Sequence, residues 1–557
     1  MAELKQPKSP LARARLVAPL LFLAGFSGCG RERAPATAQE EAPPSLSSDP
    51  APEDSLPFEE PAGDPGVRPV PRAELPAPAK PRAAADGSSA LKELDEYAKK
   101  HGGRARGIFI DLESGQTLAE LDANHAVNPA STQKLITAAA ALELLGPGYT
   151  FQTELRGAIK EDGPSSITLV GGGAPDLETS DLLLFAHALR SRGVTQIGDI
   201  YVDQSRFDGR FVPPAFEEQP GEWAAFRAPI SALALARNAV SLHVVPTKKG
   251  EPAKVWLDPP GVSVLVGQVK TLDAKDGDRV IWELAPQADA PELSSKVSGG
   301  LGAGLGHRSY QRRLDSPLLS PGLAFRQLLK ESGATVEGKV LLASQAQGST
   351  KPELITRVRS KPLSVLVREL GKDSDNFTAE MLALALSQAD GGAANAPWST
   401  ERGVLRMKKW LEAVGIDTSG LTLRNGSGLF GANLVTCQAL ARVLEKMAAH
   451  SAASPEFMSQ LAIGGSDGTL RNRFVSGALS QKVRAKTGTL ADTIALAGYL
   501  LRGEGRRPIV FCTIVSGVRG RHTEVRGRID RALQSFESLV ASRPSAMEKP
   551  KAVATEP

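Results

Sequence analysis

Three short motifs stand in a fixed order along this chain, and they constrain its fold more than any other feature of the sequence. They are Ser131-Thr-Gln-Lys134, Ser374-Asp-Asn376 and Lys486-Thr-Gly488. The first serine lies 243 positions before the second, and the second lies 112 positions before Lys486. Each motif alone occurs by chance. A chain that uses all three must bring three distant segments into one site.

The sequence around each motif supports this reading. The first motif opens a run of alanines and leucines that predicts a helix over 131–145, stopped by Gly146-Pro147. The second precedes a helix predicted to begin near Phe377, and the third lies in a predicted strand that ends at Leu490. Together they are the S-x-x-K, S-x-N and K-T-G set of enzymes that acylate a serine with a D-alanyl peptide or a β-lactam.

The motifs, their flanks and the long first gap resemble the penicillin-binding D-alanyl-D-alanine carboxypeptidase/endopeptidase family (low-molecular-mass class C, peptidase family S13). The resemblance extends from 93 to 540 and includes the segments 170–177, 426–429 and 467–470. It implies that the protein hydrolyses peptidoglycan peptides through an acyl-enzyme and is inhibited covalently by β-lactams. It also implies that the reaction needs no metal and no cofactor.

The fold implied by the resemblance is an α/β fold. It is the penicillin-recognising serine-transferase/β-lactamase-like α/β/α domain, in which helices cover an antiparallel sheet, and members carry extra domains inside the first gap. Here short strands with Gly and Pro turns replace helical spacing after residue 150, and helical spacing returns at Leu318. We therefore expect a catalytic domain at 90–155 and 316–540, interrupted by an inserted β-rich module at 156–315.

Ser131 and Lys134 are spaced i, i+3, so on a helix their side chains share a face. Lys134 must be neutral to take the serine proton. A lysine pKa starts near ~10.4 and falls when the amine is desolvated or lies near another cation, for which Lys486 is the candidate. Taken alone, the motif equally describes an N-cap serine beside a surface lysine. The other two motifs favour the catalytic reading.

Ser374 and Asn376 lie two positions apart, which in an extended loop places both side chains on one side of the backbone. Ser and Asp are also favoured helix N-caps, and that structural role is compatible with a catalytic one. By resemblance, Ser374 relays a proton to the leaving amine, and Asn376 orients Lys134 and the substrate amide.

The third motif suits a strand that binds substrate, because a glycine such as Gly488 lets another backbone approach closely. By resemblance this strand pairs with the substrate as an added strand. Lys486 and Thr487 would hold the terminal carboxylate, and the backbone N–H of Thr489 would form the oxyanion hole with that of Ser131. Taken alone, the motif equally describes an exposed strand with a solvated lysine.

The N-terminus predicts export. A basic region precedes an apolar stretch over 16–28, which is too short to span a bilayer as a helix. It ends Phe26-Ser-Gly-Cys29 and resembles a bacterial lipoprotein signal, although Phe26 stands where that signal has an aliphatic residue. We expect a signal peptide over 1–29, a lipid on Cys29 that anchors the protein to a membrane, and a periplasmic mature protein. The alternative is an ordinary cleaved signal peptide, which also places the mature protein outside the inner membrane. The Pro/Ala-rich linker 30–88 and the tail 541–557 are expected to be disordered.

Composition excludes several other classes of protein. The net charge of +4 is small for 557 residues, and basic residues do not alternate with aromatic ones, so we expect no nucleic-acid partner. The seven histidines show no metal-ligand spacing. A disulfide between Cys437 and Cys512 stays open.

Several functional alternatives also stay open. A class A β-lactamase would carry a Glu-x-x-Leu-Asn element after Ser374; none is found, which leaves the deacylating base unassigned. A catalytically silent wall-binding lipoprotein would not need intact motifs. The segment Gly464-Gly-Ser466-Asp-Gly468 fits a nucleophile elbow, but a predicted helix over 455–462 stands where an elbow needs a strand. Asp203 and Asp208 are candidates to read the substrate side chain, although each also suits a surface turn.

Overall fold

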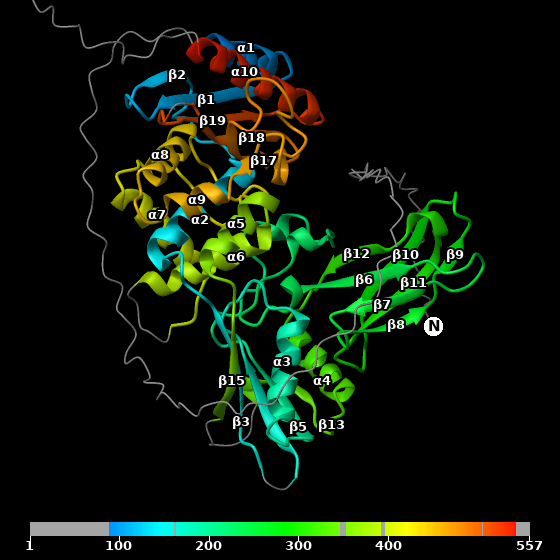
Figure 1. The fold of residues 1–557 in the computed structure, drawn as a ribbon. Coiled ribbons are helices and arrows are strands. Elements are labelled where there is room, and N and C mark those ends of the chain that lie inside the picture. The colour runs from blue at the N-terminus through cyan, green and yellow to red at the C-terminus, as the bar shows by residue number, and fades with distance from the viewer. Residues whose placement is uncertain (1–87, 161–162, 346–351, 391–395, 504, 542–557) are drawn as a thin grey trace, which may run out of the picture. The chain divides into compact units, whose positions relative to one another are not determined.

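The computed structural model describes residues 88–160, 163–345, 352–390, 396–503 and 505–541 (Figure 1). The predicted signal peptide with Cys29, the predicted linker up to residue 87 and the predicted tail beyond residue 541 lie outside the described residues. In the part that the structure describes, no helix is both long and apolar enough to cross a membrane.

The catalytic domain is built on a six-stranded antiparallel sheet. The first two of its strands in the sequence form a hairpin, and the last two pair in antiparallel register. The order across the sheet is β16 (Ala462–Ile463), β17 (Val483–Thr489), β18 (Thr493–Leu500), β19 (Ile509–Ser516), β1 (Arg104–Asp111) and β2 (Thr117–Leu121).

Helices cover both faces of this sheet, because alternate residues of its central strands point to opposite sides. Phe109 and Phe511 belong to the apolar cluster under α1 (Ser88–Lys100) and α10 (His522–Ala541), and Phe109 stacks on Phe536 of α10. Ile108 belongs to the larger core on the other face, which contains α8 (Cys437–Ala448). The predicted α/β/α fold is confirmed (Figure 1).

The layer with α8 also contains the helices that carry the first two motifs. Helix α2 is buried along nine of its twelve residues, and its run of alanines allows neighbouring helices to approach closely. Cys437 on α8 and Cys512 on β19 are buried free thiols, so the structure contains no disulfide between them. The helices of this layer besides α8 are α2 (Lys134–Leu145), α5 (Leu363–Asp373), α6 (Asn376–Ala385), α7 (Thr400–Ala413) and α9 (Ser454–Ser459).

The insertion contains three further sheets and two helices. The helices are α3 (Thr179–Arg190) and α4 (Ser320–Glu331). One sheet combines β13 (Thr335–Val336), β5 (Gln196–Asp203), β4 (Ser165–Val170), β3 (Gln152–Gly157), β15 (Glu353–Arg359) and β14 (Val340–Leu342). A second has the order β12 (Arg308–Arg313), β6 (Ala239–Val245) and β7 (Lys254–Asp258). The third combines β10 (Asp278–Pro286), β11 (Leu293–Gly302), β8 (Ser263–Gly267) and β9 (Lys270–Leu272).

The expected end of the insertion at residue 315 is wrong. β15 pairs with β3 in antiparallel register, from Gln152 opposite Arg359 to Gly157 opposite Glu353, and β13 and β14 pair with β5. α4 packs against α3 and β5. The insertion therefore extends to about residue 359, and the catalytic domain resumes at α5. Helical spacing predicted α4 itself, but spacing does not reveal which sheet a helix covers.

Candidate active site

Ser131 lies in a short 3-10 turn, Ala130–Gln133, directly before α2. The turn is held by Asn128, whose Oδ1 accepts from Ala130 N at 3.0 Å and whose Nδ2 donates to Phe430 O at 2.6 Å. In a 3-10 turn, side chains three positions apart lie one above the other. Accordingly Lys134 Nζ lies 2.9 Å from Ser131 Oγ.

Lys134 is fully buried, and its Nζ contacts three oxygen atoms. Besides Ser131 Oγ, these are Asn376 Oδ1 at 2.7 Å and Ser427 O at 2.8 Å. Burial lowers the pKa of Lys134 to about 7, against the opposing effect of the carboxylates of Glu380 and Asp375. Near pH 7 a large fraction of Lys134 is therefore neutral and able to accept a proton from Ser131.

The second motif forms a tight turn between α5 and α6. Ser374 adopts a left-handed backbone conformation with φ of +58°, and Asp375 caps α6 by accepting from Phe377 N. The turn sends Asn376 toward Lys134, as the sequence predicts. Ser374 instead meets the third motif, because Lys486 Nζ lies 2.7 Å from Ser374 Oγ.

Lys486 lies on β17 and is fully buried, like Lys134. Burial, and next the proximity of Lys134, hold the pKa of Lys486 well below its usual range. We expected desolvation or the charge of Lys486 to lower the pKa of Lys134. Burial is the main cause of that shift, and two amines buried this close together each disfavour the charged form of the other.

Strand β17 runs directly beside the turn that carries Ser131. A Cβ atom on Gly488 would lie 2.9 Å from Pro129 O and 3.1 Å from Ala130 Cβ, so glycine is required for this approach. β16 pairs only with Arg484 and Ala485 of β17. The stretch from Lys486 to Thr489 therefore lies beyond β16, where an extended peptide could add as a strand. Thr487 is half-buried, and Thr489 is exposed.

A buried carboxylate that the sequence analysis did not assign supports this arrangement. Glu380 on α6 accepts from Ser427 N at 2.8 Å and from Gly426 N at 3.1 Å. Burial raises the pKa of Glu380, while its hydrogen bonds from Ser427 and Gly426 oppose that rise. Glu380 thus holds the N–H of Ser427, the residue whose carbonyl contacts Lys134. Its spacing of i, i+4 from Asn376 was the signal that could have found it.

The insertion also contributes to the site. Asn376 Nδ2 donates to the backbone carbonyl of Phe226 at 3.1 Å, and Phe226 lies in a 3-10 turn, Ala225–Arg227, within the insertion. Arg237, also in the insertion, lies 3.5 Å from Asp375. No local pattern in the sequence indicates these contacts, because more than 130 residues separate the partners.

The other candidates take up structural positions. Asp203 accepts from Ser205 N, and Asp208 accepts from Arg210 N, as surface turn residues do. Ser466 follows β16, which is a strand of only two residues, whereas the sequence predicted a helix through residue 462. His522, the histidine downstream of Ser466, lies 3.0 Å from Ala491 O.

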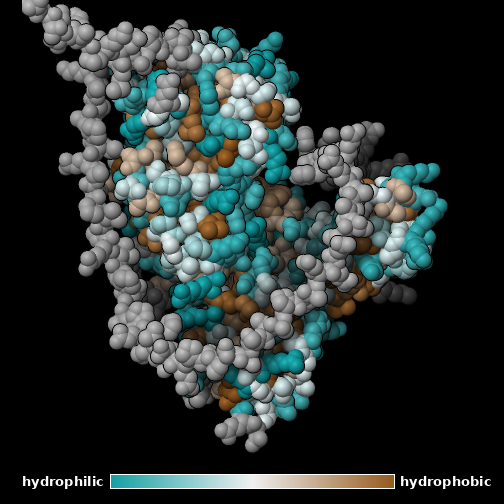
Figure 2. Space-filling model, in the orientation of Figure 1, coloured by the Kyte–Doolittle hydropathy of each residue, from teal (hydrophilic) through white to brown (hydrophobic). Residues whose placement is uncertain are grey.

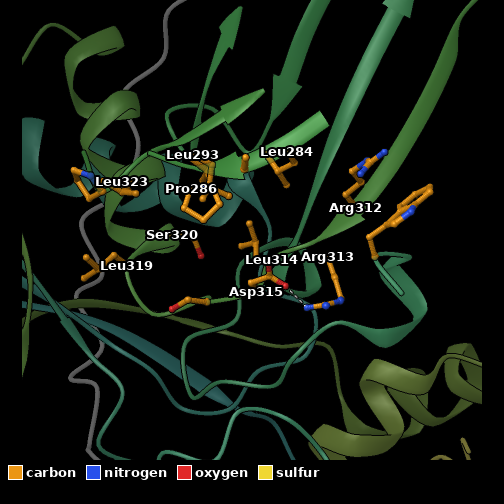
Figure 3. Close-up of a pocket in the computed structure, with 15 residues that line it drawn as sticks. Leu284, Pro286, Leu293, Arg312, Arg313, Leu314, Asp315, Leu319, Ser320 and Leu323 are labelled. Carbon is orange, nitrogen blue, oxygen red and sulfur yellow. Dashed lines mark hydrogen bonds and ion pairs between the residues drawn. The ribbon is translucent and has the colours of Figure 1, made fainter. Parts of the chain in front are cut away.

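A cavity of about 280 Å³ lies within the insertion (Figure 3). Apolar residues such as Leu284, Leu293 and Leu323 line much of it, and Arg313 pairs with Asp315 at its border. None of the motif residues lines this cavity, so it is separate from the site at Ser131. Among the residues that the structure describes, no three His, Cys, Asp or Glu side chains are grouped to hold a metal ion.

An α/β/α fold in which a buried lysine contacts a serine at the start of a helix defines a serine enzyme of the penicillin-recognising class. The chain belongs to the D-Ala-D-Ala carboxypeptidase 3 (S13) family, whose sequence model matches residues 90–538. The predicted family is thereby confirmed. As a member, the protein is a serine-type D-Ala-D-Ala carboxypeptidase, a hydrolase of the penicillin-binding type.

Two sequence relatives and one solved structure illustrate the match. The D-alanyl-D-alanine carboxypeptidase of Actinomadura sp. (strain R39) is 32% identical over 436 residues, which cover 74% of this chain and 78% of that protein. A carboxypeptidase of Mycolicibacterium smegmatis is 29% identical over 80% of this chain and 82% of that protein. The crystal structure of penicillin binding protein 4 from Haemophilus influenzae matches with a TM-score of 0.65 and 25% identity, covering 81% of this chain and 99% of that one.

Proposed function

We propose that the protein hydrolyses D-alanyl-D-alanine bonds of peptidoglycan peptides through an acyl-enzyme on Ser131. The observation that carries the proposal is the fully buried Lys134, 2.9 Å from Ser131 Oγ and with a pKa lowered to about 7. A serine nucleophile needs an adjacent base that is neutral near the working pH. Lys134 meets that requirement, with no metal or cofactor.

In the acylation step, Ser131 Oγ attacks the carbonyl carbon of the penultimate D-alanine, and its proton passes to Lys134 Nζ. The backbone N–H groups of Ser131 and Thr489 stabilise the oxyanion. The bond to the terminal D-alanine then breaks, and its amine leaves with a proton relayed by Ser374. The contact of 2.7 Å between Ser374 Oγ and Lys486 Nζ supports this relay.

The substrate backbone lies along β17 beyond β16, where Gly488 permits close approach. Lys486 and Thr487 hold the terminal carboxylate when the last residue of the peptide is the leaving group. Asn376 holds the substrate amide while its Oδ1 positions Lys134. Water then attacks the ester carbonyl, releasing the shortened peptide and returning the proton to Ser131.

β-Lactams would acylate the same serine, since the Haemophilus influenzae protein is also known in complex with a β-lactam. A fluorescent penicillin tests the proposal. We expect one stable adduct, which peptide mapping locates at Ser131. An adduct on Ser374 or Ser466 would contradict the assignment. Rapid loss of the label would indicate a β-lactamase, and absence of labelling in folded protein would indicate a silent wall-binding protein.

We also propose that the protein works in the periplasm as a lipoprotein anchored through Cys29. The support is the sequence alone, in which an apolar stretch ends at Cys29 and a proline-rich segment of nearly 60 residues follows it. At up to about 3.1 Å per residue, such a tether would reach on the order of 100 Å or more. Cys29→Ser should move the protein into the soluble envelope fraction and leave acylation unchanged. Wild-type protein that is already soluble would contradict the anchor.

A further inference from the structure

The outer face of the three-stranded sheet β12-β6-β7 carries an aromatic platform, in which Trp256 stacks against the rings of His243 and His307. His243 on β6 lies directly opposite Trp256 on β7, with ring centroids 5.0 Å apart and planes within 10°. His307 precedes β12, and its plane lies within 10° of that of Trp256 and 21° of that of His243. The three rings therefore share one orientation.

The two histidines meet edge to edge. His243 Nδ1 and His307 Nε2 are 3.1 Å apart, while the ring centroids are 5.2 Å apart, which is too far for face-to-face stacking. Burial, and next His307, lower the pKa of His243, and the two ring nitrogens are close enough to share one hydrogen bond. This pair fixes the rings beside Trp256, whose side chain stays 45% exposed.

Polar side chains surround the platform on the same face. Because alternate residues of a strand share a face, Ser241, Ser309 and Gln311 lie on the side of His243. Gln311 Nε2 donates to Ser241 Oγ at 3.2 Å, which leaves its carbonyl oxygen available to a ligand. The inward residues Leu242 and Val244 are buried, so the face is a rigid surface backed by a packed core.

A groove of about 460 Å³ begins at Trp256 and extends between β8 and α4. Its lining combines the apolar Val264 and Leu265 of β8 with the polar Gln327 and Lys330 of α4. In Figure 2, brown residues are visible along the lower border of this module, where β7 and β8 run in Figure 1. Its volume is within the range of small-ligand sites, about 300–1,000 Å³.

This combination matches the chemistry of a sugar ring. A pyranose presents a face of C–H groups, which packs on the electron-rich face of an aromatic ring, and a rim of hydroxyls that need donors and acceptors. The exposed part of Trp256, backed by the two stacked histidines and with polar side chains nearby, meets both needs. A peptide or protein ligand would instead favour an enclosed apolar core with a polar rim.

We propose that the platform and the groove bind the glycan strand of peptidoglycan, with one pyranose ring stacked on Trp256. The inference rests on the proposed function, since the peptides that this enzyme would cleave are carried on such a strand. The insertion would then hold the polymer while the site at Ser131 processes its peptides. Binding would raise the local concentration of peptide without touching the reacting bond.

The test uses the full-length protein with Ser131→Ala, and beads that carry peptide-free glycan chains prepared from peptidoglycan by amidase digestion. We expect Trp256→Ala to weaken binding by roughly three- to tenfold, and Trp256→Phe to restore most of it. Trp223→Ala is the matched control, because Trp223 also lies in the insertion and is 51% exposed. It should bind like the parent.

Folding is checked with the same variants on a Ser131 background, where labelled penicillin should react at the wild-type rate. If Trp256→Ala fails this check, the two single variants Trp256→Phe and His307→Ala are compared instead. His307→Ala should then weaken glycan binding, whereas Trp256→Phe should keep most of it. Equal binding by the parent and Trp256→Ala would overturn the proposal. So would absence of glycan binding by the parent, or retention only on beads that carry peptides or proteins. Because the probe has no peptide, failure of the proposed catalysis would not change this readout.

Discussion

Replacing Glu380 with glutamine removes a buried negative charge while keeping the shape of the side chain. The carboxylate accepts from Ser427 N at 2.8 Å and from Gly426 N at 3.1 Å. An amide has a single acceptor oxygen, so one of these N–H groups would face an NH2 group. Hydrogen bonds to charged groups contribute ~1.5–3 kcal/mol each, and we expect the free energy of unfolding to fall by about 2–4 kcal/mol.

The same change should move the pH dependence of acylation. Glu380 raises the pKa of Lys134 against the larger effect of burial, and the two effects together leave it at about 7. Without the carboxylate, the pKa of Lys134 falls further, and the amine becomes neutral at a lower pH. Because only the neutral amine accepts the proton of Ser131, the acid limb of the acylation rate should shift to lower pH.

Stopped-flow acylation by a fluorescent penicillin, measured on both sides of pH 7, gives the position of the acid limb. Chemical denaturation of the same variant gives its stability. Glu353→Gln is the control, since it removes an exposed carboxylate on β15. It should leave both quantities unchanged. An acid limb in Glu380→Gln that stays in place, or that moves to higher pH, would refute the reasoning.

Three further substitutions test the other contacts. Lys134→Arg should slow acylation of Ser131 by about 10²–10⁴-fold, because a guanidinium cannot be deprotonated; substantial labelling by fluorescent penicillin would contradict the role of base. Ser374→Ala removes the hydroxyl 2.7 Å from Lys486 Nζ, and release of D-alanine from a peptide substrate should fall by about 10²-fold or more. An unchanged rate would exclude the relay. Gly488→Ala places a Cβ 2.9 Å from Pro129 O and should slow acylation about tenfold or more by displacing β17. Gly503→Ala is the control, because its Cβ would meet no atom within 4 Å. Equal acylation rates in the two variants would show that β17 does not approach the Ser131 turn tightly.

The part of the candidate site to which we assign the chemistry could be predicted from the sequence, because its residues lie in short motifs with their own local geometry. The spacing of Ser131 and Lys134 fixes a shared face, and the Asp of the second motif caps the helix that follows it. The glycine of the third motif marks the close approach of β17. The first two relations each span fewer than five residues, and in the third the glycine that permits the approach is itself part of the motif.

The parts that escaped prediction depend on contacts between distant segments. Glu380 was visible as a carboxylate after the second motif, but its partners at 426 and 427 follow from the packing of α6. The carbonyl of Phe226 reaches Asn376 from the insertion. The boundary at 315 was misplaced for the same reason, since β15 shows its membership only through its pairing with β3.

The pairing of β3 with β15 also determines how the protein can change over time. The chain leaves the catalytic domain and returns to it through neighbouring strands, with Gln152 opposite Arg359 and Tyr149 O accepting from Leu363 N. During evolution the insertion could therefore become longer or shorter, or be exchanged, without any change in the path of the chain through the catalytic domain. Contacts between the insertion and the catalytic site limit that freedom, among them the hydrogen bond from Asn376 to Phe226. Any replacement that dispenses with the turn at Phe226 must offer the Asn376 amide another acceptor.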